Sequence, residues 1–239
     1  MIIQACLNGA RPNSYHSRLP TTSAELAQDA LACIAAGAAE LHIHPRSKDG
    51  SESLVAVDDT IRAVRQACPG TLVGVSTGAW IEGDEERTRS CIAAWREIPD
   101  YASVNLSEKD APAVIALLSD IGVGVEAGLA TAADAKRFVS LPECHKIFRI
   151  LIEIEEQDLS EADRIVEDIS AILEISNVRR QILLHGFDET VWHFVGKARQ
   201  LHWSTRVGLE DGCHLSDETV AHDNAALTRE AVQVFARHL

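Results

Sequence analysis

The amino-acid sequence predicts a (β/α)8 TIM barrel, an α/β fold, and two observations point to it. Short apolar runs typical of β-strands alternate with longer runs of helical periodicity about every thirty residues. No Pro/Gly-rich linker or change of composition divides the chain, so we expect a single domain over residues 1–239. A doubly wound open sheet is the alternative, but its GxGxxG fingerprint after the first strand is missing.

Strands and helices can be placed along the chain from this alternation. The first helix is the clearest, because Thr22 and Glu25 have the spacing of a capping box and Gly37 is a natural stop. The expected strands are Ile2–Leu7, Glu40–His44, Leu72–Ser76, Ala102–Asn105, Val123–Glu126, Ile147–Ile154, Gln181–His185 and Ser204–Leu209. The later helices are expected at Asp58–Ala67, Glu85–Glu97, Ala111–Ser119, Ala132–Val139, Glu161–Leu173, Glu189–Gln200 and Asp217–Ala236.

Composition and charge argue against several classes of function. The formal net charge is −14 and no basic stripe is visible, so nucleic acid is not an expected partner. No apolar run approaches the roughly 20 residues that span a bilayer, so no membrane partner is expected either. The N-terminus lacks the features of a signal peptide, and the 6 cysteines are scattered without a CxxC pair. These features predict a cytoplasmic protein with free thiols.

Polar residues gather on one face of each predicted strand and at the strand ends. Alternate residues of a barrel strand face the interior, and active sites of such barrels lie at the C-terminal strand ends. Because unpaired charges are costly in a closed core, these residues predict an active site at the barrel mouth. The polar residues expected to face inward are Gln4, Cys6, Asn8, His42, His44, Ser76, Ser103, Asn105, Glu126, Glu153, Glu155, His185, Arg206 and Glu210.

Two of these residues, His42 and His44, have the spacing of a chelating pair. Side chains at i and i+2 share a strand face with Cα atoms about 6–7 Å apart, so both imidazoles can reach one ion. Catalytic Zn²⁺ takes three protein ligands, and Glu210 is the best third ligand because even-numbered strands share an interior layer. One Zn²⁺ per chain is therefore expected. The same ligands also suit non-haem iron or manganese, and a pair of hydrogen-bonded strand-end histidines is the alternative.

Several segments resemble the β-keto acid cleavage enzymes, a family that includes 3-keto-5-aminohexanoate cleavage enzymes. The similarity runs in order through "LNGAR", "LPTTSAELAQDALACIAAGAAELHIHPR", "GVSTG", "ASVNLSE", "VGVEAGL" and "TRVGLEDG". The resemblance implies a zinc-dependent (β/α)8 barrel that reacts a β-keto acid with acetyl-CoA to give acetoacetate and a new CoA thioester. Acetyl-CoA would then be a co-substrate, and the implied assembly is a homo-oligomer, commonly a tetramer, with a dimer as the other possibility.

The resemblance also implies roles for individual residues. It assigns zinc binding to His42, His44 and Glu210, and the matching catalytic positions are Arg206, Asp211, Glu126 and Ser76. The residues expected to contact substrate are Asn105, Ser103, Asn8, Arg11, Trp80 and His185. An unassisted guanidinium is a poor base, so Asp211 must contribute to any proton transfer by Arg206. A purely structural Arg206–Asp211 ion pair is the alternative.

The chain departs from the family pattern at several positions. Arg11 stands where some members carry an acid just after the strand-1 glycine, and Gly212 stands where an asparagine often follows "LED". Trp80 and His185 lie where members differ, so we expect them to select the substrate, although each could be a packed strand-end residue. The chain is also shorter than many members, which puts parts of the CoA-binding or subunit-contact elements in doubt.

Two competing functions remain open. The first is a metal-dependent barrel hydrolase or aldolase-type lyase that does not use CoA. Amidohydrolase-like enzymes place HxH on strand 1 and add a set of histidines or lysines on strands 4 to 6, whereas here HxH lies on strand 2. The second is a non-catalytic metal-binding or assembly protein, which gives Arg206, Glu126 and Ser76 no reason to converge.

Overall fold

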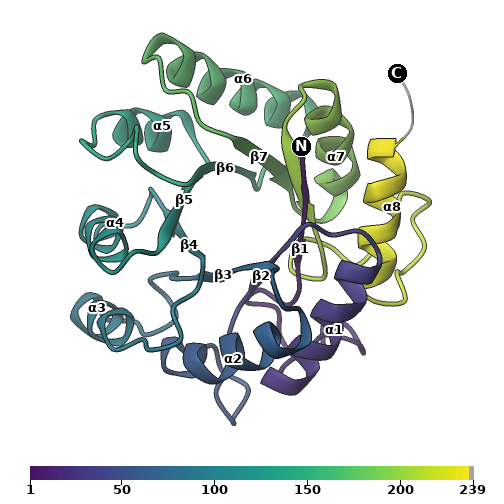
Figure 1. The fold of residues 1–239 in the computed structure, drawn as a ribbon. Helices are drawn as coiled ribbons and strands as arrows, with labels where there is room; N and C mark the ends of the chain where they lie inside the picture. The colour runs from purple at the N-terminus through teal and green to yellow at the C-terminus, as the bar shows by residue number, and fades with distance from the viewer. Residues whose placement is uncertain (237–239) are drawn as a thin grey trace.

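The eight strands form one closed parallel barrel in the order β1 to β8, and the helices surround it (Figure 1). The structure is a computed structural model that describes residues 1–236. Residues 237–239 of the predicted domain lie outside the described residues. Every strand pairs in parallel with its neighbours in the chain, and β1 pairs with β8 to close the sheet. The predicted (β/α)8 barrel is confirmed, and the open sheet is excluded.

The strands and helices alternate along the chain. The strands are β1 (Ile3–Cys6), β2 (Glu40–Ile43), β3 (Leu72–Ser76), β4 (Tyr101–Asn105), β5 (Gly124–Leu129), β6 (Arg149–Ile154), β7 (Ile182–Gly186) and β8 (Ser204–Val207). The helices are α1 (Ser23–Ala35), α2 (Val57–Ala67), α3 (Glu85–Ala93), α4 (Ala111–Asp120), α5 (Ala132–Val139), α6 (Leu159–Ile175), α7 (Val191–Gln200) and α8 (Asn224–Ala236). Two 3₁₀ turns, η1 (Leu54–Ala56) and η2 (Asp188–Thr190), precede α2 and α7.

Local capping explains where the helices begin. Thr22 and Glu25 form the predicted capping box at the start of α1. The expectation that the last helix begins at Asp217 is wrong, because α8 begins at Asn224. Asp223 accepts a hydrogen bond from the backbone N–H of Ala226 and so satisfies one of the free donors at this helix end.

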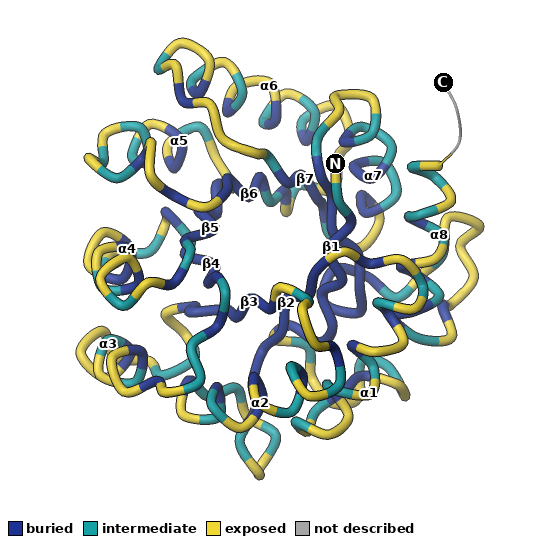
Figure 2. Tube along the Cα trace, viewed as in Figure 1, coloured by how far each residue is buried: buried dark blue, intermediate teal, exposed yellow. Residues whose placement is uncertain are grey.

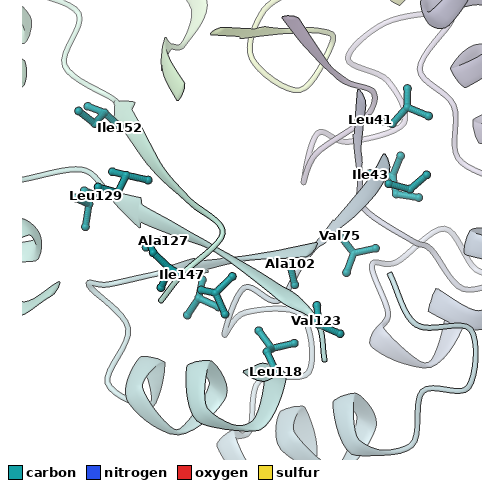
Figure 3. Close-up of a cluster of buried hydrophobic side chains, with 14 of the residues drawn as sticks. Leu41, Ile43, Val75, Ala102, Leu118, Val123, Ala127, Leu129, Ile147 and Ile152 are labelled. Carbon is teal, nitrogen blue, oxygen red and sulfur yellow. The ribbon is translucent and has the colours of Figure 1, made fainter. Parts of the chain in front are cut away.

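The apolar core lies between the barrel and the helices. The outward-facing strand residues Leu41, Ile43 and Val75 are fully buried, and Figure 3 shows them along the strands of the barrel. Figure 2 shows the same division, with buried strands at the centre and the exposed residues on the outer faces of the helices. Because the helices cover the apolar faces, the polar side chains are left on the inside of the barrel.

No helix within residues 1–236 is long and apolar enough to cross a membrane. The cytoplasmic location of the protein stays a prediction.

Candidate metal centre and active site

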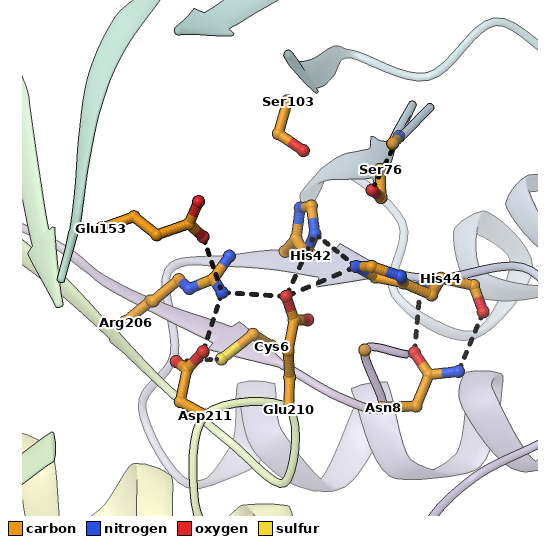
Figure 4. A network of polar contacts seen from close by, with 12 residues as sticks. Cys6, Asn8, His42, His44, Ser76, Ser103, Glu153, Arg206, Glu210 and Asp211 are labelled. Carbon is orange, nitrogen blue, oxygen red and sulfur yellow. Dashed lines mark hydrogen bonds and ion pairs between the residues drawn. The ribbon is translucent and has the colours of Figure 1, made fainter. Parts of the chain in front are cut away.

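The predicted metal ligands converge at one point inside the barrel (Figure 4). His42 Nε2 lies 3.2 Å from His44 Nε2 and 3.7 Å from Glu210 Oε1, and His44 Nε2 lies 3.4 Å from that same oxygen. Tetrahedral ligands at about 2.0–2.2 Å from one ion are about 3.3–3.6 Å from one another. The triangle of ligand atoms therefore fits a single Zn²⁺-sized ion with little rearrangement.

The charges of the three groups also suit a metal ion. Burial lowers the pKa of His42 to about 4, so this imidazole is neutral at pH 7. Burial opposes a charge on His44 too, but Glu210 and Glu52 outweigh it and raise the pKa of His44 to about 9. Burial disfavours the Glu210 carboxylate, yet Arg206 and the two histidines hold its pKa well below the usual range. An incoming cation meets one neutral imidazole and one carboxylate, and it displaces the proton of the second imidazole.

The β1–α1 loop fixes the positions of two ligands. The Asn8 amide donates to the carbonyl of His44 over 2.8 Å and accepts from the His44 backbone N–H over 2.9 Å. Gly9 has a φ of 53°, and a Cβ there would lie 2.5 Å from Cγ of Glu210. Only glycine allows the Glu210 side chain to lie on this loop. Asn8, which we expected to contact substrate, is fully buried and positions His44 instead.

The second cluster surrounds Arg206, whose side chain is 2% exposed. Its Nη2 lies 2.8 Å from Glu210 Oε1 and 2.7 Å from Asp211 Oδ1, and Glu153 Oε2 lies 3.9 Å away. Burial opposes the guanidinium charge, but Asp211 and Glu210 raise the pKa of Arg206 well above its usual value. Arg206 is therefore a fixed cation beside the metal ligands.

Two further side chains contact the buried Asp211. The Cys6 thiol lies 2.8 Å from Asp211 Oδ2 and donates to it, and His185 Nδ1 lies 3.4 Å from Oδ1. His185 Nε2 lies 3.5 Å from Glu153 Oε2 on the other side of the ring. Burial and Arg206 disfavour a charge on His185, but Asp211 and Glu153 outweigh them and raise its pKa. His185 is thus buried between Asp211 and Glu153, and of these three residues Glu153 lines the cleft.

Arg11, expected to contact substrate, lines the cleft but directs its Nε and one Nη to the protein. Its Nε donates to the Glu210 carbonyl over 2.9 Å, and one Nη donates to the Asp211 carbonyl and to Asp188 Oδ1. The guanidinium also lies over the Tyr15 ring. Through these hydrogen bonds Arg11 stabilises the backbone of the loop that carries Glu210 and Asp211.

Replacing Arg11 with methionine is expected to reduce the free energy of unfolding by about 1–3 kcal/mol, because two carbonyls lose a charged donor. The freed loop should also bind Zn²⁺ more weakly. Urea unfolding of the metal-free protein and a zinc titration check both effects. Arg11→Lys should rescue neither effect fully, because an ammonium cannot reproduce the planar fork. A methionine variant with wild-type stability and affinity would contradict this role.

Glu126 does not reach this cluster. The expectation that strand 5 ends at Glu126 is wrong, since β5 continues to Leu129 and leaves Glu126 in mid-strand. Its Oε2 accepts from Arg149 Nε over 2.7 Å, and Gln4 donates to it over 3.3 Å. Arg149 and Gln4 lie near the N-terminal ends of their strands. The inward direction was predicted correctly, but the level within the barrel was not.

The ligand cluster opens into a cleft of about 810 Å³. Asn105, Trp80 and Glu153 lie in its walls. Ser76 and Ser103 are paired in register on neighbouring strands, and Figure 4 shows them on the side of the two histidines opposite Glu210. The cleft is lined by Ala10, Arg11, Pro12, His44, Trp80, Asn105, Glu153, Glu155, Gln157, Phe187, Asp188 and Glu210. Its size falls within the range of small-molecule sites.

A profile of the beta-keto acid cleavage enzymes matches residues 1–150, more than half of the chain. The chain belongs to the beta-keto acid cleavage enzyme family. The 3-keto-5-aminohexanoate cleavage enzyme of Acetoanaerobium sticklandii is 33% identical over 91 residues, which cover 36% of this chain and 33% of that protein. The enzyme of the same name from Fusobacterium nucleatum is 33% identical over 81 residues, covering 33% of this chain and 30% of that protein. The matched stretches thus span about a third of each relative.

Solved structures of proteins with low sequence identity to this beta-keto acid cleavage family member have the same barrel fold. A binary complex of ObcA with oxaloacetate superposes with a TM-score of 0.73 at 15% identity and covers 90% of this chain and 63% of that chain. The 3-dehydroquinate dehydratase of Geobacillus kaustophilus superposes with a TM-score of 0.62 at 12% identity, over 99% of this chain and 92% of that chain. At these identities the likeness concerns the fold alone.

Sequence reasoning missed two polar contacts of this family member's site. Glu52 lies 2.5 Å from His44 Nδ1, but it lies outside the predicted strands and was not predicted as a site residue. The turn-forming "KDG" before it was the available signal, because a tight turn there returns the chain to the end of β2. The thiol of Cys6 was expected to face inward, but its contact with Asp211 depends on the long-range closure of β1 with β8.

Proposed function

We propose that this protein is a zinc-dependent transferase that cleaves a β-keto acid with acetyl-CoA, giving acetoacetate and a new CoA thioester. The observation that carries the proposal is the His42–His44–Glu210 triangle with the Arg206–Asp211 ion pair directly beside it. Family membership supports the same reaction class. The carbon balance is simple: acetyl-CoA provides the acetyl group of acetoacetate, and the acyl group of the keto acid leaves as the thioester.

His42, His44 and Glu210 would hold one Zn²⁺ per chain. The chemistry that a bound ion supplies at such a site is Lewis-acid polarisation of the 3-keto oxygen. Two imidazoles and one carboxylate leave at least one coordination position for a substrate oxygen. Glu210 also accepts from Arg206, so its orientation is set before substrate arrives.

Arg206 and Asp211 would stabilise the negative charge that forms on the keto acid and transfer its C2 proton. The fixed guanidinium can stabilise the negative charge that develops when the C2 proton of the keto acid is removed. Asp211 accepts a hydrogen bond from Arg206 Nη2, so Arg206 would receive the C2 proton while it passes the Nη2 proton to Asp211. The enolate carbon would then attack the acetyl thioester, and CoA would leave as its thiolate. The thiolate would attack the 3-keto carbon, so that the C2–C3 bond breaks, the new CoA thioester forms, and acetoacetate leaves as an enolate that takes the proton back at C2.

Polar groups on β3 and β4 would orient the substrate. Ser76 ends β3, Asn105 ends β4, and Ser103 lies one inward-facing position before Asn105, so these three side chains could donate hydrogen bonds to the keto acid carboxylate. Trp80 lines the cleft and would limit the size of the remaining substrate chain, and the buried His185 would act only through Glu153, which lies in the cleft wall. The cleft provides the volume for the reacting ends of both substrates.

A panel of β-keto acids, each incubated with and without acetyl-CoA, tests the proposal. We expect acetoacetate and a new CoA thioester from at least one keto acid, only with acetyl-CoA present, and loss of turnover after treatment with a chelator. Turnover without CoA would favour the metal-dependent hydrolase or aldolase-type lyase. No turnover of any keto acid by zinc-loaded protein would favour a non-catalytic metal-binding protein. The homo-oligomer stays a prediction that light scattering tests.

A further inference from the structure

The loop after β2 folds back on itself and returns Glu52 to the outer side of His44. The backbone N–H of Gly50 donates to the Ser47 carbonyl, and that of Ser53 donates to the Pro45 carbonyl. The Asp49 side chain accepts from the backbone N–H of Ser51 and closes the turn. These local bonds make the short distance between residues 44 and 52 a built feature of the loop.

The contact between Glu52 and His44 fixes the proton on one ring nitrogen. Glu52 Oε1 lies 2.5 Å from His44 Nδ1, whereas the Nε2 atom of the same ring faces Glu210. Glu52 therefore lies on the side of the ring away from the ligand triangle and is not a ligand itself. Because Oε1 accepts a hydrogen bond, Nδ1 must carry the proton, which leaves the Nε2 lone pair for an ion.

Trp80 from the β3–α3 loop holds the other oxygen of Glu52. Its Nε1–H donates to Glu52 Oε2 over 2.9 Å, although the side chain is 52% exposed and lines the cleft. The ring lies on Gly78, where a Cβ would be 2.3 Å from the ring atoms, so only glycine leaves room for it. With both oxygens accepting, Glu52 is held as a carboxylate in one orientation.

A second bond ties the two loops together. Glu82 of the β3–α3 loop accepts from the backbone N–H of Leu54, directly after the Glu52 turn. The indole of Trp95 donates to the Leu54 carbonyl from the other side. The Glu52 segment is therefore anchored independently of any ion, and its carboxylate is in place before metal binds.

We propose that Glu52 is the positioning residue of the metal centre, which orients His44 for metal binding, and that Trp80 locks Glu52 from the cleft wall. The inference rests on the metal site of the proposed function. Partners of this kind on a ligating histidine typically contribute about 10–100-fold to metal affinity. Trp80 therefore connects the substrate cleft to the metal centre through a single carboxylate.

Zinc titrations of Glu52→Ala, Glu52→Gln and Trp80→Phe test the proposal, with Glu167→Gln on the outer helix α6 as a control that also removes one negative charge. We expect affinity to fall about 10–100-fold in Glu52→Ala. Glu52→Gln should lose less, because one amide oxygen still accepts but cannot serve both donors. Trp80→Phe should lose less than about tenfold, since it removes one hydrogen bond. Glu167→Gln should bind as wild type does.

The imidazole ¹⁵N–¹H spectrum of the zinc-loaded protein gives a readout that a purely structural role would not change. In wild type, His44 Nδ1–H should appear as a proton protected from exchange with water, and Glu52→Gln, which preserves the shape of the side chain, should weaken that protection. Wild-type affinity in both Glu52 variants would overturn the inference while leaving the proposed function intact. Absence of zinc binding by wild type would contradict the metal site itself.

Discussion

Replacing His42 with alanine is expected to abolish turnover and to reduce the metal content from about one Zn²⁺ per chain to nearly none. His42 provides one corner of the ligand triangle, and the remaining His44 and Glu210 leave only two protein ligands. Elemental mass spectrometry of the purified variant, beside wild type reconstituted with zinc, measures this directly.

The matched control for this variant is His145→Ala. His145 is an exposed histidine between α5 and β6, so its loss tests the effect of removing any imidazole. Far-UV circular dichroism and urea unfolding of the metal-free proteins separate metal loss from misfolding. A folded His42→Ala protein that keeps a full complement of zinc would contradict the chelate.

Replacing Asp211 with asparagine is expected to lower kcat about 100–10,000-fold while the zinc content stays near that of wild type. Asparagine keeps the shape of the side chain but removes the charge that faces Arg206 at 2.7 Å. It also removes the carboxylate that would take up the proton from Arg206. Steady-state kinetics with the best keto acid of the panel, together with metal analysis, check the two halves of this prediction.

A Cys6→Ser variant is the control for the hydrogen bond on the other oxygen of Asp211. The hydroxyl keeps a donor in place of the thiol that donates to Oδ2, so kcat should change little. If Asp211→Asn retains kcat within about threefold of wild type, the Arg206–Asp211 pair is a structural ion pair and not part of the proton-transfer machinery.

The barrel and the triangle of metal ligands could be predicted because both follow from the regular alternation of apolar and polar residues in the sequence. Period-two alternation places His42 and His44 on one face, and the pairing of β8 with β1 brings the β8 loop beside β2. Predicting the position of Glu210 therefore required only the correct order of strands around the barrel. The confirmed fold required no knowledge of individual contacts.

The rest of the site depends on how far along its strand each residue lies and on how the loops fold. The alternation of residues in the sequence does not determine either of these. Glu126 faces inward as predicted, but three more residues of β5 leave it bound to Arg149 instead of at the mouth. Asn8 and Arg11 use their donors on the loops that carry the ligands. Glu52 reaches His44 only because a turn reverses the chain, and such contacts depend on the dihedral angles of single residues.

Tracing the acetyl group of acetyl-CoA tests whether it becomes part of acetoacetate. The zinc-loaded protein would be supplied with an unlabelled β-keto acid and with acetyl-CoA carrying ¹³C at both acetyl carbons, and the acetoacetate would be examined by NMR. The proposed reaction predicts ¹³C at C3 and C4 only, with C1 and C2 coming from the keto acid. Unlabelled acetoacetate, or label found in the carboxyl end, would contradict acetyl transfer from acetyl-CoA.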